Sequence, residues 1–184
     1  MAKKSGCAGF TLIELLVVVA LMVILQSLAA PAFSAMVKSM RLTTATNSLF
    51  SSLLLARSEA IKRNSRAVVC KSATGNACIT SGGWEQGWIV FHDANNNAAL
   101  DAGEDLVSRE QALPQPIRLT GNDPVVSYVS YTPMGRTNYT SGGFQAGTLT
   151  VCTQSATSVA AREIKISISG RPRTLKTTVA QCPQ

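Results

Sequence analysis

The longest hydrophobic run in the chain occupies residues 10–30, near the N-terminus. Most of these 21 residues are Leu, Val, Ile, Ala, Met or Phe, and Glu14 is the only charged one. As an α-helix with ~1.5 Å rise per residue, the run would be about 30 Å long, which is the thickness of a bilayer's hydrocarbon core. The pattern therefore predicts a helix that can span a membrane.

After residue 30 the apolar positions keep helical spacing, but polar residues now separate them. These positions are Met36, Met40, Leu42, Leu49, Leu53, Leu54, Leu55, Ala56, Ala60 and Ile61. The spacing predicts an amphipathic helix that ends near Asn64 and Ser65. Pro31 lacks a backbone donor and is expected to bend or loosen the helix. We therefore expect one long helix, half in the membrane and half in a domain.

After Arg66 the pattern changes to short β-branched runs separated by Gly, Asn, Pro and Ser, which is typical of strands and turns. The predicted strands are residues 67–71, 87–92, 106–110, 117–120, 125–131, 148–153, 162–169 and 174–180. The last two are the clearest, because Ile164, Ile166 and Ile168 alternate with polar neighbours and residues 170–173 are typical of a turn. We expect an antiparallel hairpin there.

Residues 1–9 form a short leader that carries Lys3 and Lys4. A secretory signal has its cleavage site after the apolar run, whereas Gly9 stands directly before Phe10, so a cut here would leave the helix on the mature chain. A carboxylate such as Glu14 inside an apolar run costs about 2.5–3.5 kcal/mol to bury in lipid. We expect it to find a partner, for which the free α-amino group of Phe10 on a neighbouring subunit is suitable.

The chain divides by these patterns into the leader, a membrane-spanning half-helix at 10–34 and a globular domain at 35–184, which is enough for one modest core. Lys and Arg outnumber Asp and Glu by 17 to 10 in the 184 residues. The mature chain would still be basic, because only two of these lysines lie in the leader. Excess positive charge favours polyanions such as nucleic acid, or anionic surfaces.

Five cysteines are present, and Cys7 lies in the leader. The mature chain keeps an even four, which fits disulfides in a domain outside the cytoplasm: Cys70, Cys78, Cys152 and Cys182. Three pairings are possible, and proximity in sequence favours the first two together and the last two together. A zinc site is the competing interpretation, although the spacings lack a C-x-x-C unit and His92 is the only histidine.

No catalytic grouping is evident, so we expect no enzyme and no cofactor. His92 ends the run W-I-V-F-H beside Asp93, with no nucleophile at motif spacing. The two Gly-rich segments, 81–83 and 141–143, do not open helices and are therefore interpreted as loops rather than phosphate-binding sites.

Residues 93–104 are rich in Asp and Asn. Oxygen-bearing side chains occupy the first, third, fifth, ninth and twelfth places of a possible calcium loop: Asp93, Asn95, Asn97, Asp101 and Glu104. Against calcium, the sixth place is Ala98 rather than Gly, and the flanking runs are typical of strands rather than helices. We favour a plain solvated turn, in which Asn and Asp tolerate left-handed backbone, and keep calcium as the alternative.

The predicted C-terminal turn, G-R-P-R, places two guanidinium groups at one end of the hairpin. Arg162, Lys165 and Lys176 lie on the adjoining strands, and some of these must share a face with Arg171 and Arg173. Two rigid arginines can hold successive phosphates with salt-sensitive, sequence-independent affinity. A disulfide closing the loop of about 30 residues around the hairpin would add ~3–4 kcal/mol of stability. The competing interpretation is an ordinary solvated turn.

Residues 3–21, K-K-S-G-C-A-G-F-T-L-I-E-L-L-V-V-V-A-L, resemble the class III signal and N-terminal helix of type IV pilins and pseudopilins. The resemblance implies that a prepilin peptidase cuts after Gly9 and methylates the new N-terminus at Phe10. It also implies that Glu14 sets the register during assembly. Such proteins cross the inner membrane once with the domain in the periplasm, and afterwards become part of a pilus or pseudopilus at the cell surface.

The rest of the chain resembles the GspH/FimT family of minor pilins and pseudopilins. The resemblance rests on W-x-x-G-W-I-V-F-x-D-x-N-x-N at 84–97, Y-T-P-M-G-R at 131–136 and the paired C-terminal strands. It implies an α+β, pilin-like fold in which a long N-terminal helix packs on antiparallel β-sheets. Two roles occur in this family: a pseudopilin of type II secretion, and the FimT branch of minor type IV pilins, which bind DNA in natural transformation.

The motif at Gly170, Arg171 and Arg173 is similar to the DNA-binding G-R-x-R of the FimT branch. Charge and position alone add Arg136, Lys165 and Lys176 to the predicted DNA contacts. The expected function is therefore that of a minor type IV pilin that captures double-stranded DNA for uptake, without base readout. Its expected partners are DNA, other pilins, prepilin peptidase and inner-membrane lipid. The alternatives are a GspH-like subunit for secretion or pilus priming, and a calcium-dependent adhesin or assembly switch.

Overall fold

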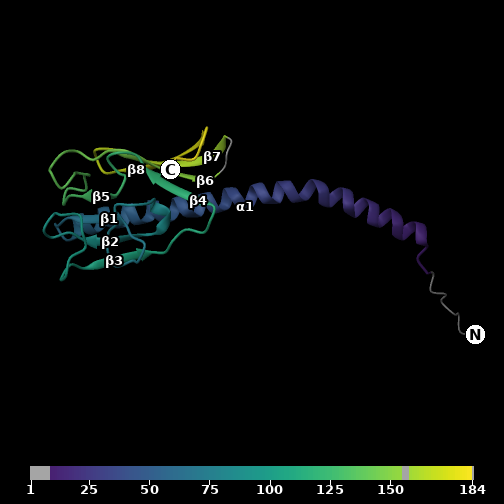
Figure 1. The fold of residues 1–184 in the computed structure, drawn as a ribbon, viewed down its shortest axis with the longest axis horizontal. Coiled ribbons are helices and arrows are strands. Elements are labelled where there is room, and N and C mark those ends of the chain that lie inside the picture. The colour runs from purple at the N-terminus through teal and green to yellow at the C-terminus, as the bar shows by residue number, and fades with distance from the viewer. Residues whose placement is uncertain (1–8, 155–157, 184) are drawn as a thin grey trace, which may run out of the picture. The chain divides into compact units, whose positions relative to one another are not determined.

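The computed structural model describes residues 9–154 and 158–183, so most of the predicted leader, including Cys7, lies outside the described residues. The described residues form one long α-helix, one short 3-10 helix and eight strands (Figure 1). The chain divides into two compact units, one ending at Ser39 and one comprising Met40–Gln184.

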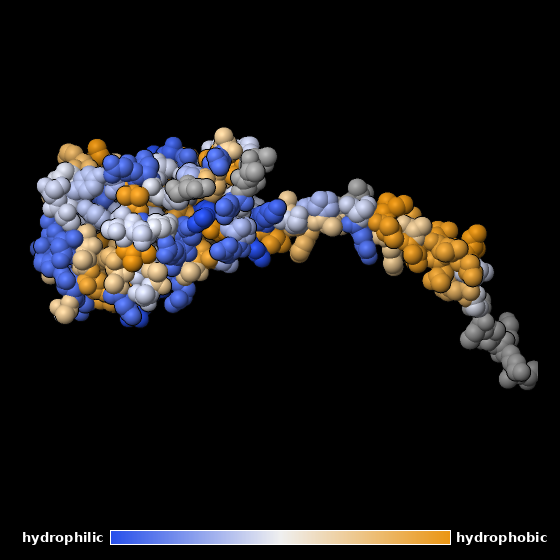
Figure 2. All heavy atoms as spheres, viewed as in Figure 1, coloured by the Kyte–Doolittle hydropathy of each residue, from blue (hydrophilic) through white to orange (hydrophobic). Residues whose placement is uncertain are grey.

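The first unit contains the N-terminal part of α1, which spans Leu12–Lys62 and continues through Pro31. Its described side chains between residues 12 and 36 are exposed, and Figure 2 shows the hydrophobic ones gathered there. The helix is long and apolar enough to cross a membrane. Thr11 precedes it and accepts a hydrogen bond from the Glu14 amide at 3.3 Å, which satisfies one free donor of the first turn.

In the second unit, α1 buries one face at a period near 3.6. The buried apolar residues are Leu42, Ala45, Leu49, Leu53, Ala56 and Ala60. The helix ends in a Schellman motif: Asn64 has φ 49°, its amide bonds the Ile61 carbonyl, and the Ser65 amide bonds the Ala60 carbonyl. The last residue of α1 is Lys62, two residues before the predicted stop at Asn64 and Ser65.

The strands form two antiparallel four-stranded sheets, which confirms the predicted α+β pilin-like class. The first has the order β3-β2-β1-β5, built from Leu106–Glu110, Trp88–His92, Ala67–Lys71 and Tyr128–Tyr131. The second has the order β4-β6-β7-β8, built from Ile117–Gly121, Gly147–Thr153, Val159–Ile166 and Pro172–Val179. Figure 1 shows the second sheet along one side of the C-terminal part of α1, with β2 and β3 along the other.

One hydrophobic core joins α1 to the inner faces of both sheets, with Leu49, Val90 and Ile164 as representatives. A second, smaller core lies on the other face of the first sheet. There Val68 and Phe91 are covered by Cys78 and by Ala98 and Leu100, which belong to the loop between β2 and β3. Strands β1 and β2 are buried on both faces for this reason, and their sequences are nearly continuous apolar runs.

Both disulfides have the pairing that proximity favoured, Cys70–Cys78 and Cys152–Cys182. Cys70–Cys78 joins β1 to the loop that follows it. Cys152–Cys182 ties β6 to the C-terminal segment beyond β8. All four cysteines of the described residues are therefore used in disulfides, which leaves no free thiolate for the zinc alternative.

Two strand predictions were wrong in part. Residues 125–127 are not in a strand: Val125 closes a turn in which its amide bonds the Asn122 carbonyl at 2.7 Å, and its side chain enters the main core. The predicted strand 162–169 is displaced: β7 ends at Ile166, and the third isoleucine, Ile168, lies in the turn with 48% of its surface exposed.

Candidate functional site

The turn of the C-terminal hairpin lies three residues earlier than the sequence suggested. The Gly170 amide bonds the Ser167 carbonyl at 2.8 Å, and Gly170 has φ +73°, a conformation that side chains disfavour. Pro172 is already in β8, is buried and pairs with Ile166. Arg171 therefore directly follows the turn, and Arg173 lies on β8. We use the name arginine turn for residues 167–173, which comprise the turn and both arginines.

The arginine turn packs on a second turn, residues 132–136, which closes through a 2.8 Å bond from the Gly135 amide to the Thr132 carbonyl. A Cβ atom on Gly170 would lie 2.1 Å from the Gly135 carbonyl oxygen and 3.2 Å from Cα of Arg136. The second turn is held in place from α1, because Arg57 Nε donates to the Gly135 carbonyl at 3.1 Å.

This contact brings together two segments that were singled out separately, Y-T-P-M-G-R and G-R-P-R. It places the backbone of Arg136 beside Gly170, the residue before Arg171, so that Arg136 lies next to the turn that leads to Arg171 and Arg173. All three side chains are exposed, and none of the ion pairs found in the described part of the chain involves them. Sequence reasoning added Arg136 from charge and position; the long-range contact between the two glycines has no local signal.

The register of β7 and β8 divides the other basic residues between two faces. Arg173 pairs with Lys165, whereas Lys176 pairs with Arg162. Because alternate residues point to opposite faces, Lys165 and Arg173 lie on the outer face of the second sheet and Lys176 lies on the face that carries Ile164. Lys165 also forms an ion pair with Glu163 at 3.2 Å. The predicted DNA contacts thus form a group of four, and Lys176 is separated from it.

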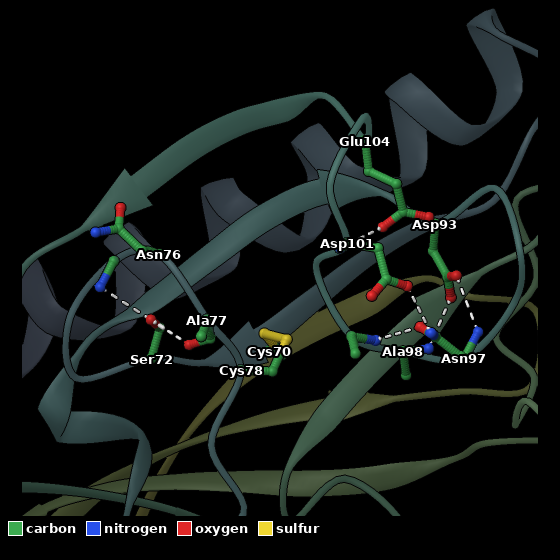
Figure 3. The surroundings of a disulfide bond; sticks show 12 residues. Cys70, Ser72, Asn76, Ala77, Cys78, Asp93, Asn97, Ala98, Asp101 and Glu104 are labelled. Atoms are coloured by element: carbon green, nitrogen blue, oxygen red, sulfur yellow. Dashed lines mark hydrogen bonds between the residues drawn. A yellow bond between two sulfur atoms is a disulfide. The ribbon is translucent and has the colours of Figure 1, made fainter.

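The Asn-rich loop, residues 93–104, uses its carboxylates to hold its own shape (Figure 3). Asp93 is 1% exposed and accepts hydrogen bonds from the amides of Asn97 and Ala98, each at 3.0 Å. Glu104 accepts from the amides of Ala94 and Asp101 at 2.8 and 3.1 Å. We call this segment the acidic loop.

The side-chain amides of Asn95 and Asn97 point their nitrogens at Asp101, at 2.8 and 2.7 Å. These bonds hold the pKa of Asp101 below its usual value. Ala98, which replaces the expected glycine, has φ 58°. Within the described residues no group of three or more His, Cys, Asp or Glu side chains is arranged to hold a metal ion. The carboxylates of Asp93 and Glu104 are therefore occupied by amides of the loop itself, and Asp93 is buried rather than solvated as the sequence suggested.

His92 belongs to a charged cluster that fastens α1 to β2. Its Nε2 lies 3.3 Å from Glu59, which also pairs with Arg63 at 3.2 Å, and Arg63 in turn pairs with Asp105. Although desolvation opposes it, the hydrogen bond with His92 and the charges of Lys62 and Arg63 hold the pKa of Glu59 below its usual value. The geometry assigns His92 a structural role.

Lys71 was not singled out from the sequence, yet it is 1% exposed. Its Nζ donates to the carbonyls of Thr80 and Gly82, at 2.9 and 2.7 Å, and burial lowers its pKa. It fastens the segment after the Cys70–Cys78 loop to β1. The only feature of the sequence that could have indicated this buried lysine is its place at the end of an apolar strand.

The long helix, with its apolar N-terminal part, and the two antiparallel sheets are the architecture of a pilin or pseudopilin. The sequence model described as "Type II transport protein GspH" matches residues 45–170, and that of the prokaryotic N-terminal methylation motif matches residues 4–29. The chain therefore belongs to the GspH family, whose fold and N-terminal motif fit a membrane-anchored pilin assembled into a pilus. No curated protein sequence matches the chain.

Solved structures of the same fold include the type IV minor pilin FimU of Pseudomonas aeruginosa. In one crystal form the match has 15% sequence identity, covers 79% of this chain and 98% of FimU, and has a TM-score of 0.57. In a second crystal form it has 16% sequence identity, covers 77% of this chain and 100% of FimU, and has a TM-score of 0.52. The minor pseudopilin EpsH of the Vibrio cholerae type 2 secretion system matches with 12% identity, 73% of this chain, 96% of EpsH and a TM-score of 0.47. These matched proteins are pilin subunits rather than enzymes.

Proposed function

We propose that this protein is a minor type IV pilin that captures double-stranded DNA through the arginine turn and Arg136, for uptake in natural transformation. The observation that carries the proposal is the packing of Gly170 on Gly135, which brings Arg136 beside the chain segment that carries Arg171 and Arg173, all three of them exposed. Guanidinium groups bind phosphate oxygens in pairs of hydrogen bonds and stay charged at any physiological pH.

The rigidity of the site supports this role. Pro172 and the hairpin register fix the backbone beside Arg171 and Arg173. A preorganised site loses less conformational entropy when it binds. Phosphate contacts position DNA without reading its sequence, so we expect all duplexes of equal length to bind alike.

Before assembly, prepilin peptidase would cut after Gly9 and methylate Phe10, which is 80% exposed and precedes α1. Glu14, in the first helical turn, would then pair with the N-terminus of a neighbouring pilin. Inner-membrane lipid would surround the exposed apolar part of α1 until the subunit enters the filament, with its globular unit on the periplasmic side. Retraction by other proteins would draw bound DNA inward.

The test is a fluorescence-anisotropy titration of the full chain in detergent micelles against a labelled DNA duplex at several salt concentrations. Three phosphate contacts predict a slope of log affinity against log salt of about −3. Arg171→Ala/Arg173→Ala should abolish most binding. Arg109→Ala/Lys176→Ala removes the same charge from exposed positions outside the group and should bind almost as the wild type does. Equal binding by both double variants would show that the proposal is wrong.

A second role, as a subunit of a type II secretion pseudopilus or of a pilus priming complex, is favoured by the family match itself, whose description is a type II transport protein. Deletion of the gene would then block secretion or pilus formation. Complementation with Arg171→Ala/Arg173→Ala separates the roles, because an assembly subunit would be restored fully and a DNA receptor would not.

A further inference from the structure

We propose that the DNA path continues from the arginine turn across the outer face of the second sheet, along the row Arg173, Lys165 and Thr148, and that Glu163 weakens binding there by holding Lys165. This inference rests on the proposed function and deepens it, because it gives the bound duplex a direction and assigns the site an internal competitor.

The row follows from the strand register. Arg173 lies opposite Lys165, and Lys165 lies opposite Thr148 on β6. Beyond β6, Asn122 completes the row, since its side-chain oxygen accepts the Thr148 amide at 2.7 Å. Strands are about 4.8 Å apart, so the row from Arg173 to Thr148 covers ~10 Å, or the axial spacing of about three phosphates on one DNA strand.

The surface along this row is hollow and polar. A depression of about 320 Å³ is lined by residues that include Thr120, Asn122, Thr148, Thr150 and Lys165. Hydroxyl and amide side chains commonly bind phosphate and sugar oxygens in DNA complexes. Lys165 lines the depression and pairs with Arg173 across the hairpin, so the depression lies next to Arg173.

Glu163 is the acidic side chain in the same depression. It lies two residues before Lys165 on the same face of β7 and forms an ion pair with it at 3.2 Å, with 22% of the carboxylate side chain and 53% of the lysine side chain exposed. A phosphate that approaches Lys165 must therefore displace or tolerate this carboxylate. Loss of the negative charge should free the lysine and strengthen binding.

Lys176 offers a matched control. It is also an exposed lysine of the same hairpin, but its register partner is Arg162, which places it on the opposite face of the sheet. Lys165→Ala and Lys176→Ala change the net charge equally. A general effect of charge would weaken both variants alike, whereas a path across the outer face would weaken only the first.

The experiment measures the affinity of the full chain in detergent micelles for a labelled duplex. The salt concentration is varied from roughly 50 to 200 mM, a range over which affinity depends strongly on the number of phosphate contacts. Lys165→Ala should weaken binding about five- to tenfold at ~0.1 M salt and reduce the salt slope by about 1. Glu163→Gln should strengthen binding about two- to fivefold, Lys165→Arg should bind as the wild type does, and Lys176→Ala should change affinity less than about twofold.

Thermal melting of each variant separates these effects from misfolding. If Lys165→Ala and Lys176→Ala bind alike, or if Glu163→Gln binds no better than the wild type, the inference is wrong. The proposed function can still stand in that case, provided that Arg171→Ala/Arg173→Ala abolishes binding. If that double variant also binds normally, the proposed function itself fails.

Discussion

The arginine turn and the acidic loop are both polar, turn-rich connections between strands, yet they use their charges in opposite ways. In the acidic loop, Asp93 and Glu104 accept hydrogen bonds from backbone amides of the loop itself. The arginine turn takes its shape from Gly170 and from backbone hydrogen bonds. Among the described residues its guanidinium groups form no hydrogen bond or ion pair that holds that shape, so they stay available to a ligand.

The comparison shows why a charged loop is not by itself a binding site. Buried or self-bonded carboxylates have already replaced water with the chain's own donors, and a ligand would have to break those bonds. Exposed arginines on a rigid backbone lose only water and counterions when a phosphate binds. The predictions below test this difference in the order of the effects expected.

The largest effect should come from Asp93→Ala. The substitution leaves the amides of Asn97 and Ala98 without their buried acceptor, at a cost of about 2–4 kcal/mol in the free energy of unfolding. Chemical denaturation measures it. Asp123→Ala, at an exposed position, is the control and should cost less than about 1 kcal/mol. A stable Asp93→Ala protein would mean that the loop does not depend on its carboxylate.

Gly170→Ala should cost about 1–3 kcal/mol and also weaken DNA binding, because the new methyl group meets the Gly135 carbonyl and the residue must keep a positive φ. The matched control is Gly142→Ala. Gly142 also has a positive φ, 98°, but a Cβ there meets nothing within 4 Å. The difference in melting temperature between the two variants isolates the contact between the turns, and equal values would contradict it.

A smaller effect is expected from acid. Hydrogen bonds from Asn95 and Asn97 lower the pKa of Asp101 in the folded protein, so the unfolded chain binds its proton first as the pH falls. The stabilising contribution is therefore complete above the unfolded value of about 3.9 and is lost as the pH falls through the lower folded value. Side-chain amide resonances of the two asparagines report the change by NMR; if they do not respond to acid, the hydrogen bonds are not formed in solution.

Calcium should have the smallest effect of all. Because the oxygens of the acidic loop already accept the loop's own hydrogen bonds, a titration with CaCl₂ should leave the melting temperature unchanged. MgCl₂ at the same ionic strength is the control. A rise in melting temperature with calcium alone, abolished by Asp101→Asn, would restore the calcium alternative.

Much of the fold could be predicted, because local patterns report burial. The bounds of β1 and β3 agree with the prediction, and α1 ends two residues before its predicted stop. The errors have identifiable causes. Val125 is apolar because it fills the core from a turn, and Ile168 continues the alternation of Ile164 and Ile166 past the end of the strand without being buried.

The sequence alone determined the membrane-type helix, the α+β class, the favoured disulfide pairing and the motifs that point to this family, since each depends on residues close together in the chain. Only the tertiary structure decided which cations share a surface. Lys165 pairs with Arg173, which lies three residues before Lys176 on β8, and residues an odd number of positions apart on a strand face opposite sides of the sheet. Likewise, the contact of Gly170 with Gly135 joins distant turns, and no local pattern of hydrophobic and polar residues encodes such a contact.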